Sequence, residues 1–273
     1  MTRRVSLHRP GTRVVLLIAI TAVGAFLRLH RIGSLPPAEG YDAAYYGVDA
    51  LELLRGDPPQ VMYPPNREPL FSYLVAASFL AFGASKTAIH LASAAVGILT
   101  IPAVYLAVDA LFREADERLR RWGPILSALM VALSYWHLNW SRLGVRAILV
   151  PLLSAGVMAA LWRGLHNRRP WPFLVSGALL GLSMYTYQAA RLMPLVVVFA
   201  FAASALKRGS VTRQDWTQLL VVAGVAALVF APLGAHFLTH PGSFSRRVEE
   251  PLMVQPGEEA SQNLTAVLMH TAE

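Results

Sequence analysis

The chain has 273 residues, of which 55% are hydrophobic and only 15% are charged. Its mean hydropathy is +0.46, its net charge is +8, and it contains no cysteine. A soluble domain carries about a quarter charged residues, so this composition excludes an ordinary soluble protein, and the lack of cysteine excludes disulfides and thiolate metal sites. Apolar blocks of about 20 residues recur along the chain, which predicts an all-α polytopic membrane protein. Because the basic residues mostly flank these blocks, we expect no nucleic-acid binding.

The first apolar block, residues 14–27, follows Arg3 and Arg4 and resembles a secretory signal peptide. However, Arg28 and many further apolar blocks come after it. We therefore predict an uncleaved first span, with the Arg28 side chain reaching the lipid headgroups.

Six later apolar blocks predict further spans, at residues 87–112, 122–140, 147–162, 171–187, 192–206 and 217–238. The run 70–82 is too short to cross a bilayer, which needs about 20 residues. If it crossed, the basic segment 113–121 would lie outside, against the positive-inside rule. We therefore predict a juxtamembrane or re-entrant helix there, about seven spans, a cytoplasmic N-terminus and an extracytoplasmic first loop at 28–86. Within the block 171–187, Gly177, Ala178, Gly181 and Ser183 are small residues that let helices approach closely.

The first outer loop carries the most informative polar residues. Asp42 opens a helical pattern that Gly56 should end. The spacing of seven places Asp49 on the same face as Asp42, with Tyr45 or Tyr46 between them. Asp42 is either an N-cap, worth about 1 kcal/mol, or a catalytic carboxylate, and the residues alone leave both open.

A second acid, Glu68, precedes the apolar run 70–82. It lies between Arg67 and Pro69, and the residues alone favour a local salt bridge or a charge at a helix start. As a partner of Asp42 it would instead complete an acidic site near the membrane surface.

Three arginines, Arg142, Arg146 and Arg191, fall on the predicted outer side, which the topology rule depletes of positive charge. A guanidinium at a helix end binds phosphate with paired donors. Each one alone is also explained by contact with headgroup phosphates, but the three together predict a phosphate site. His90, at the apolar start of a span, is either a functional ionisable residue or a packing histidine.

Signatures of nucleotide and metal sites are missing from the sequence. There is no glycine-rich phosphate loop, no His-Glu-x-x-His and no acid–histidine cluster with ligand spacing. We therefore predict no cofactor and no metal.

The motifs in order resemble a known family. An outer loop that opens with Tyr-Asp-x-Ala at 41–44 and closes with Arg-Glu-Pro-Leu-Phe-x-Tyr-Leu at 67–74 resembles the GT-C membrane glycosyltransferases. The nearest branch is glycosyltransferase family 39 with its bacterial protein-mannosyltransferase-like relatives. Residues 82–97, the Ser-Arg-x-Gly-x-Arg at 141–146 and the Tyr-x-Tyr-x-x-x-Arg at 185–191 are also similar to bacterial members.

This resemblance implies an inverting transfer of a sugar from a polyprenyl-phosphate donor to an acceptor hydroxyl of a protein, lipid or glycan. It places the protein in the plasma (inner) membrane of a prokaryote, with the active-site loop outside. Asp42 maps onto the family's loop aspartate, the base or positioning group for the acceptor, and Glu68 onto a supporting or acceptor-binding position. The residues and the resemblance together predict a substrate-binding set of Tyr45, Asp49, Glu68, His90, Arg142, Arg146, Tyr187 and Arg191.

Two positions depart from the family pattern, because Ala43 stands where glutamate is usual and His90 where arginine is usual.

Relatives are commonly longer, so we expect residues 1–273 to be the N-terminal, GT-C-type transmembrane part of a longer protein. The alternatives are a transporter or flippase of lipid-linked sugars and a truncated, non-catalytic homologue.

Overall fold

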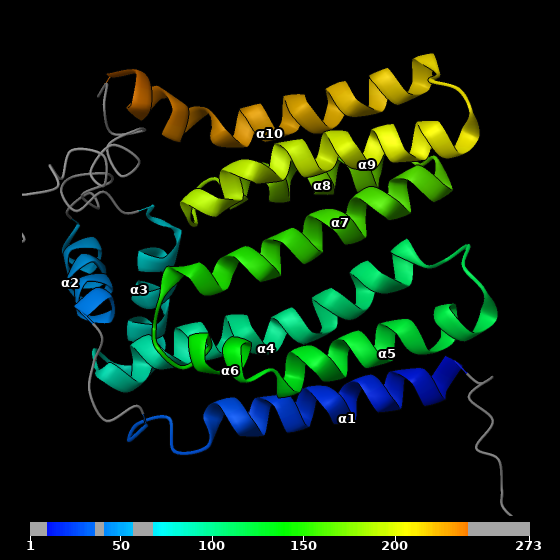
Figure 1. The fold of residues 1–273 in the computed structure, drawn as a ribbon. Coiled ribbons are helices and arrows are strands. Elements are labelled where there is room, and N and C mark those ends of the chain that lie inside the picture. The colour runs from blue at the N-terminus through cyan, green and yellow to red at the C-terminus, as the bar shows by residue number, and fades with distance from the viewer. Residues whose placement is uncertain (1–9, 36–40, 57–67, 240–273) are drawn as a thin grey trace, which may run out of the picture. The chain divides into compact units, whose positions relative to one another are not determined.

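The structure is a computed structural model that describes residues 10–35, 41–56 and 68–239. This part of the chain is helical and contains no strand (Figure 1). The α-helices are α1 (Pro10–Leu29), α2 (Tyr41–Arg55), α3 (Leu70–Phe82), α4 (Lys86–Leu111), α5 (Glu117–Leu133), α6 (Tyr135–Trp140), α7 (Leu149–Asn167), α8 (Trp171–Ser183), α9 (Met193–Arg208) and α10 (Arg213–Thr239). Two short 3-10 helices, η1 (Arg146–Ile148) and η2 (Gln188–Leu192), precede α7 and α9.

The chain forms two compact units. The first contains Met1–Val61 and Glu68–Ala231, and the second contains Met62–Arg67 and Pro232–Glu273. Of the second unit, the structure describes the end of α10, where the Thr239 hydroxyl donates to the carbonyl oxygen of Ala235 at 3.1 Å.

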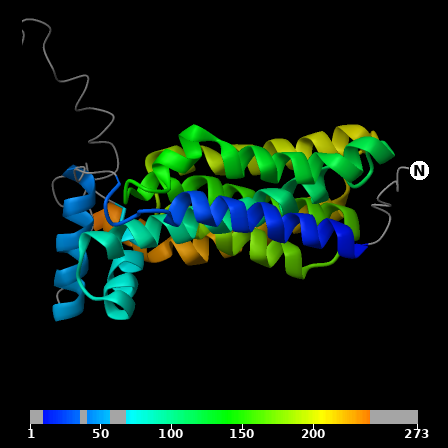
Figure 2. The same cartoon turned by 90° about the horizontal axis from the view of Figure 1, so that it is seen from below.

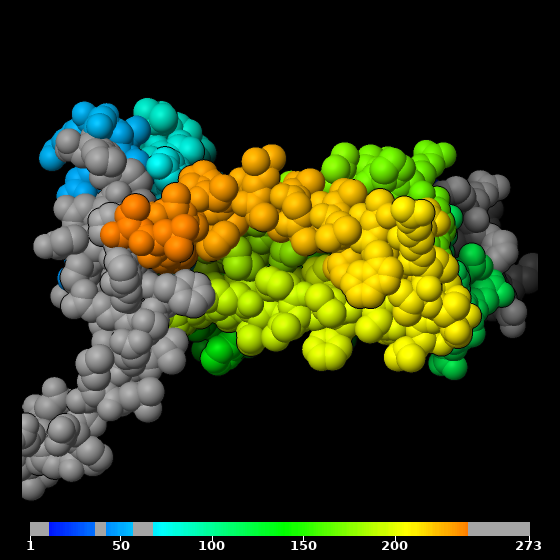
Figure 3. All heavy atoms as spheres, turned by 90° about the horizontal axis from the view of Figure 1, so that it is seen from above, coloured from blue at the N-terminus to red at the C-terminus, as the bar shows by residue number. Residues whose placement is uncertain are grey.

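In the first unit the long helices lie side by side, and α2 and α3 lie across one end of them (Figures 1 and 2). The most enclosed candidate span is η1 with α7, because 56% of its most apolar 18-residue stretch is buried inside the protein. The corresponding share for α1 is 11%. Large apolar side chains are exposed on the outer helices, as expected for lipid contact. They include Ile18 and Phe26 on α1, Met130 on α5, Phe199 and Leu206 on α9, and Leu220 and Leu228 on α10. Figure 3 shows the face on which α9 and the first part of α10 are visible along their lengths.

Five helical segments of the described chain are long and apolar enough to cross a membrane: α1, α4, η1 with α7, η2 with α9, and α10. The helices α5 and α8 are shorter, with 17 and 13 residues. Arg113 donates to the Asn167 side chain at 2.6 Å, which places the ends of α4 and α7 together. Because α4 and α7 therefore run in the same direction, α5 and α6 must return the chain between them. We still expect α5 and α8 to cross the membrane, and seven spans stay a prediction.

The short helices of the first loop have the predicted bounds. The helix α2 ends at Arg55, before Gly56 with its φ of +93°. The helix α3 covers the predicted run, ends before Gly83 with a φ of +80°, and lies across the end of the bundle rather than along it (Figure 2). Its Ser78 hydroxyl donates to the carbonyl oxygen of Ala88 on α4 at 2.7 Å.

Two predicted blocks are divided or shortened in the structure. The block 122–140 breaks at Ser134, whose hydroxyl accepts from the His137 amide at 3.3 Å and so begins α6. The block 171–187 leaves the α-helix after Ser183, where the Thr186 hydroxyl donates to the Ser183 carbonyl at 2.6 Å. In both places a hydroxyl competes for backbone groups, which disfavours continuation of the helix.

The prediction of close helix approach at Gly177 and Gly181 is confirmed. A Cβ atom on Gly177 would lie 2.7 Å from the Val222 carbonyl oxygen, and one on Gly181 would lie 2.6 Å from that of Ala226. These two glycines therefore let α8 pack directly on the backbone of α10.

Basic segments gather at one end of the first unit. Arg13 pairs with Asp109 at 3.0 Å, which brings the start of α1 to the end of α4. Lys207 pairs with Glu114 at 2.7 Å, which brings the end of α9 to the same place. We call this end, formed by residues 109–121, 163–169 and 207–215, the basic end. The opposite end, formed by α2, α3, residues 134–148 and residues 184–192, is the loop end.

Candidate functional site

The loop end contains a buried cluster of one carboxylate and two guanidinium groups. Glu68, immediately before α3, is 2% exposed and Arg146, the first residue of η1, is 3% exposed. Their Oε2 and Nη1 atoms are 3.0 Å apart. Arg191, in η2, places its Nη2 atom 3.9 Å from Glu68 Oε1. Glu68 therefore lies between arginines that open two different long helices.

The local sequence explains this placement. Val145 and Tyr187 have extended backbones with ψ values of 142° and 154°, so each 3-10 helix begins immediately after a change of direction. The Tyr185 carbonyl oxygen accepts from the Leu70 amide at 3.1 Å, which ties the start of α3 to the turn before η2. The Arg146 guanidinium carbon lies 5.4 Å from the centre of the Tyr187 ring, a cation–π contact.

Within the cluster itself, two guanidinium groups face one carboxylate. Glu68 Oε2 and Arg146 Nη1 form an ion pair, but neither atom has a hydrogen bond with the described residues. The pairing of these two atoms is therefore electrostatic rather than a well-aligned hydrogen bond.

The sequence analysis expected Asp42 to share a site with these arginines. Asp42 lies in the first turn of α2 and is exposed. No ion pair joins it to an arginine within the described residues. Its role as a base stays a prediction.

The other predicted residues of α2 have mixed environments. Asp49 accepts a hydrogen bond from the Ser72 hydroxyl of α3 at 3.0 Å, and Tyr45 is half-buried. The neighbouring Tyr46 is buried and packs edge-on against Phe71, with ring centres 5.0 Å apart. These contacts fix α2 on α3 and thereby set the position of Asp42. Arg67, the alternative partner of Glu68, lies outside the described residues.

Arg142 caps the end of α1. Its guanidinium donates to the carbonyl oxygens of Leu27 at 2.9 Å, Arg28 at 2.8 Å, His30 at 2.9 Å and Leu35 at 3.1 Å. Burial lowers the pKa of Arg142 below its usual value. Since both of its terminal nitrogens are bonded to the backbone, the structure gives it a clear structural role, and phosphate binding by Arg142 stays a prediction.

His90 is buried near the tight turn at Gly144. Its Nδ1 atom lies 3.4 Å from the Ile32 carbonyl oxygen. A Cβ atom on Gly144, which has a φ of +68°, would lie 3.3 Å from His90 Cδ2 and 3.4 Å from Ala43 Cβ. The two positions that depart from the family pattern, Ala43 and His90, therefore border the same point in the structure.

The sequence analysis missed a buried arginine network. The prediction that Arg28 reaches the headgroups is wrong, because its exposed fraction is 0%. The guanidinium donates to the carbonyl oxygens of Val131 at 3.1 Å and Ala132 at 3.2 Å, at the end of α5, and to Ser141 Oγ at 3.2 Å. It also donates to His137 Nδ1 at 2.9 Å.

The four-residue spacing of His137 and Ser141 was the one local signal of this network, because it places both side chains on one face of a helix. Burial, followed by the charge of Arg28, lowers the pKa of His137 to about 4 from its ordinary 6.5.

A metal site is not evident in the part of the chain that the structure describes, because no group of three or more histidine, aspartate or glutamate side chains is close enough to hold an ion.

The fold and the site together define the class to which the protein belongs. The protein is an all-α polytopic membrane protein with a buried acid–arginine cluster at the loop end. The sequence profile described as dolichyl-phosphate-mannose-protein mannosyltransferase matches residues 64–236. The chain belongs to this family, and it is a membrane glycosyltransferase of the GT-C type. Comparisons with curated proteins and with solved structures find no match.

The matched segment separates the candidate residues into two groups. Glu68, Arg142, Arg146 and Arg191 lie inside it, and Asp42 lies before it. The acid–arginine cluster is therefore part of the region that relates this chain to the family.

Proposed function

We propose that the protein transfers a sugar from a polyprenyl-phosphate carrier to an acceptor hydroxyl at the extracytoplasmic face, and that the reaction takes place at the loop end. The observation that supports this most directly is the buried Glu68, which lies beside the guanidinium groups of both Arg146 and Arg191. Such a cluster suits a donor whose reacting bond is to a phosphate oxygen.

The proposed orientation follows from the two ends of the bundle. Arginine and lysine residues gather at the basic end, beside the start of α1. The positive-inside rule assigns that end to the cytoplasm. The loop end then faces outward, in a prokaryotic plasma membrane, where a lipid-linked sugar would meet its acceptor.

In the proposed reaction the acceptor oxygen attacks the anomeric carbon of the sugar, and the bond from that carbon to the phosphate oxygen breaks. The leaving phosphate keeps the electron pair, and Arg191 and Arg146 stabilise its added negative charge. The proton of the acceptor hydroxyl moves to the carboxylate of Asp42, and the single displacement inverts the anomeric configuration. Glu68 neutralises part of the arginine charge before the donor binds.

Two observations fit Asp42 as the base. It is exposed, so a carboxylate oxygen is accessible to an acceptor, and it lies in the first turn of α2, at the loop end. Tyr45 and Asp49 lie further along the same helix, where they would contact the acceptor.

The test is transfer activity in membranes that contain the full-length Asp42→Asn protein, with a panel of polyprenyl-phosphate hexoses and pentoses as donors. A general base contributes about 10²- to 10⁴-fold, so we expect at least a 100-fold loss of turnover. Glu52→Gln is the matched control, because it removes another carboxylate from α2 and should keep near-normal activity.

Near-normal turnover of Asp42→Asn would remove the assignment of the base. Donor binding without transfer by the unaltered protein would favour the non-catalytic homologue instead. Movement of the lipid-linked sugar across the membrane without transfer would favour a flippase.

A further inference from the structure

A charged pocket lies at the basic end of the first unit. It is a cavity of about 460 Å³ between the ends of α4, α7 and α9. Its charged wall consists of Glu114, His166, Arg168, Lys207 and Arg208. Its apolar wall includes Leu111, Trp162, Leu165 and Ala203. We call this cavity the basic-end pocket. The transfer proposed for the loop end uses none of these residues.

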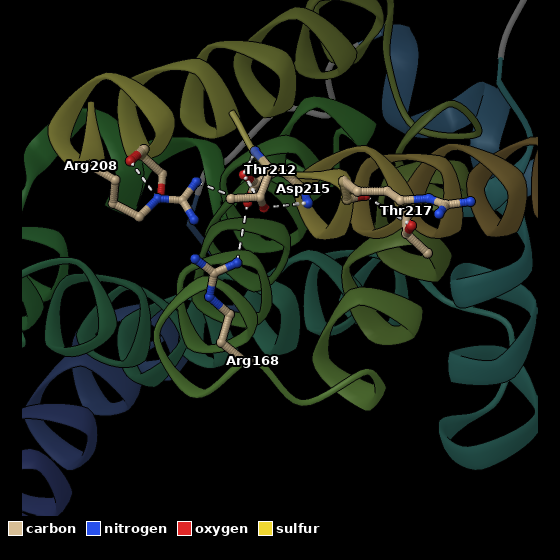
Figure 4. Close-up of polar contacts among 7 residues, drawn as sticks. Arg168, Arg208, Thr212, Asp215 and Thr217 are labelled. Carbon is tan, nitrogen blue, oxygen red and sulfur yellow. Dashed lines mark hydrogen bonds and ion pairs between the residues drawn. The ribbon is translucent and has the colours of Figure 1, made fainter. Parts of the chain in front are cut away.

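Two arginines of the pocket are held in place by a shared carboxylate. Asp215 Oδ1 lies 3.2 Å from Arg168 Nη1 and 2.9 Å from Arg208 Nη2. Its Oδ2 accepts from both the amide and the hydroxyl of Thr212 at 2.8 Å. Figure 4 shows the two guanidinium groups approaching Asp215 from different directions. Arg208 Nε also donates to the Ser204 carbonyl oxygen at 3.0 Å.

These ion pairs leave part of each guanidinium group for a ligand. Among the described residues, Arg168 uses only Nη1 and Arg208 uses Nη2 and Nε. The remaining N–H groups are donors on a planar fork that matches phosphate oxygens. Asp215 therefore positions the two arginines without consuming all of their hydrogen-bonding capacity.

The other half of the charged wall centres on Glu114. Its carboxylate lies 2.7 Å from Lys207 Nζ and 3.0 Å from His166 Nδ1. The hydrogen bond from Lys207, followed by that from His166, lowers the pKa of Glu114. His166 Nε2 lies 3.1 Å from the Ala110 carbonyl oxygen, so both ring nitrogens face acceptors.

Trp162 supplies an unused donor at the same place. Its indole Nε1 is buried and has no hydrogen-bond partner in the described part of the chain. A buried donor without a partner is disfavoured. An oxygen-rich ligand in the pocket would give this N–H group its acceptor.

We propose that the basic-end pocket binds the headgroup of an anionic glycerophospholipid, with the phosphodiester on Arg168, Lys207 and Arg208 and a headgroup hydroxyl on Glu114. The three cations outnumber the two carboxylates, Glu114 and Asp215, so the pocket favours a ligand with one negative charge. Phosphatidylglycerol has this chemistry, since its phosphodiester is an anion and its free glycerol carries hydroxyl donors.

The apolar surroundings favour a lipid over a free phosphate ester. One wall of the pocket is apolar, and Trp162 suits the membrane interface. A second, apolar groove of about 180 Å³ lies between α9 and α10 and is lined by Phe201, Ala205, Trp216 and Leu219. Asp215 also lines this groove, so the carboxylate that positions the two arginines adjoins a surface suited to an acyl chain. Basic pockets between membrane helices on the cytoplasmic side recognise anionic headgroups in this way.

The test uses the full-length protein, purified in detergent, and measures apparent dissociation constants by native mass spectrometry. Three probes separate the sources of binding: phosphatidylglycerol, phosphatidylcholine with the same acyl chains, and soluble glycerol phosphate. We expect phosphatidylglycerol to bind at least about fivefold more tightly than phosphatidylcholine, from the contribution of one basic side chain. We expect glycerol phosphate to bind weakly or not at all.

Two variants test the pocket itself. Lys207→Gln removes a cation whose side chain is 69% exposed, so the fold should tolerate it, and it should weaken phosphatidylglycerol binding about fivefold. Ala203→Phe fills the apolar wall and should weaken it further. Arg213→Gln, an exposed arginine that does not line the pocket, is the control and should keep full binding.

Equal affinity for the two lipids would overturn the proposal, as would unchanged binding in both pocket variants. Binding of glycerol phosphate as tight as that of the lipid would also overturn it, because the site would then be one for a soluble ester.

Discussion

Glu68 Oε2 lies 3.0 Å from Arg146 Nη1, and the two side chains are only 3% and 4% exposed. Such a pair is stable only while both charges are present, because removing one leaves the other buried without compensation. Since Arg191 is 3.9 Å from the same carboxylate, Glu68 holds the starts of α7 and α9 against the start of α3.

Glu68→Gln should therefore destabilise the fold by about 3 to 5 kcal/mol. The measurement is the thermal unfolding midpoint in detergent from intrinsic tryptophan fluorescence, which suits a chain with six tryptophans and no cysteine. The double variant Glu68→Gln with Arg146→Gln should lose less than the sum of the two single changes. Strict additivity would show that the pair has no net coupling.

The buried guanidinium of Arg28 leads to a second prediction. Lysine keeps the charge but cannot reach Val131, Ala132, Ser141 and His137 together, because it lacks the planar fork. Arg28→Lys should therefore cost at least about 2 kcal/mol of folding stability, from backbone carbonyls left without donors.

Arg55→Lys, at the exposed end of α2, is the control for Arg28→Lys and should change the unfolding midpoint little. Equal midpoints for the two variants would mean that the Arg28 network contributes nothing to stability.

The low pKa of His137 predicts a pH dependence. Its pKa is about 4 in the folded protein and 6.5 in an ordinary environment. Between these values the unfolded chain binds a proton that the folded chain does not, so stability should fall as the pH decreases from about 6.5 towards 4. His137→Gln keeps an acceptor for Arg28 but does not titrate, so it should flatten this part of the profile.

The measurement is the unfolding midpoint from pH 7.5 to pH 4.5, compared between the unaltered protein and His137→Gln. His30→Gln, an exposed histidine at the end of α1, should leave the profile unchanged. A profile that His137→Gln does not alter would assign the acid sensitivity to other groups.

Local signals explain why so much of the fold could be predicted. The bounds of α2 and α3 follow from Gly56 and Gly83, both with positive φ, and Ser85 caps α4 by accepting from the Ala88 amide. These signals lie within a few residues of the boundary that they set. The break at Ser134 was missed, because the apolar pattern continues across it and only a serine marks the change.

The candidate site was harder to predict, because its contacts join distant parts of the chain. The nearest cation to Glu68 in the sequence is Arg67, whereas the partners that Glu68 has among the described residues are Arg146 and Arg191, from distant turns of the chain. Arg28 was similarly misplaced, because its acceptors come from α5 and α6, more than 100 residues away. A single sequence shows which residue types are present at helix ends but not which ends meet.

The arginines of the predicted phosphate site should now separate by function. Arg191 is partly exposed beside Glu68 and should act on catalysis, so Arg191→Gln should lower turnover about 100-fold or more, as expected for the loss of one donor to a developing charge. Arg142 caps the end of α1 through four carbonyl contacts, so the main effect of Arg142→Gln should be a lower unfolding midpoint.

The comparison of Arg191→Gln with Arg142→Gln requires transfer rates per folded protein and unfolding midpoints for both variants. Equal losses of turnover at equal stability would place both arginines in the same role and contradict this division.

The contact between α8 and α10 gives a prediction with an internal control. Gly181→Ala would place a Cβ atom 2.6 Å from the Ala226 carbonyl oxygen, closer than packed atoms allow. The helices would have to separate, and overpacking of this kind costs about 1 to 3 kcal/mol. Gly224 lies inside α10 with nothing within 4 Å of the position of an added Cβ atom. Gly224→Ala should therefore stabilise the protein by up to about 1 kcal/mol, since alanine is the better helix former. Unfolding midpoints that shift in the same direction for both variants would show that the approach of α8 to α10 does not depend on Gly181.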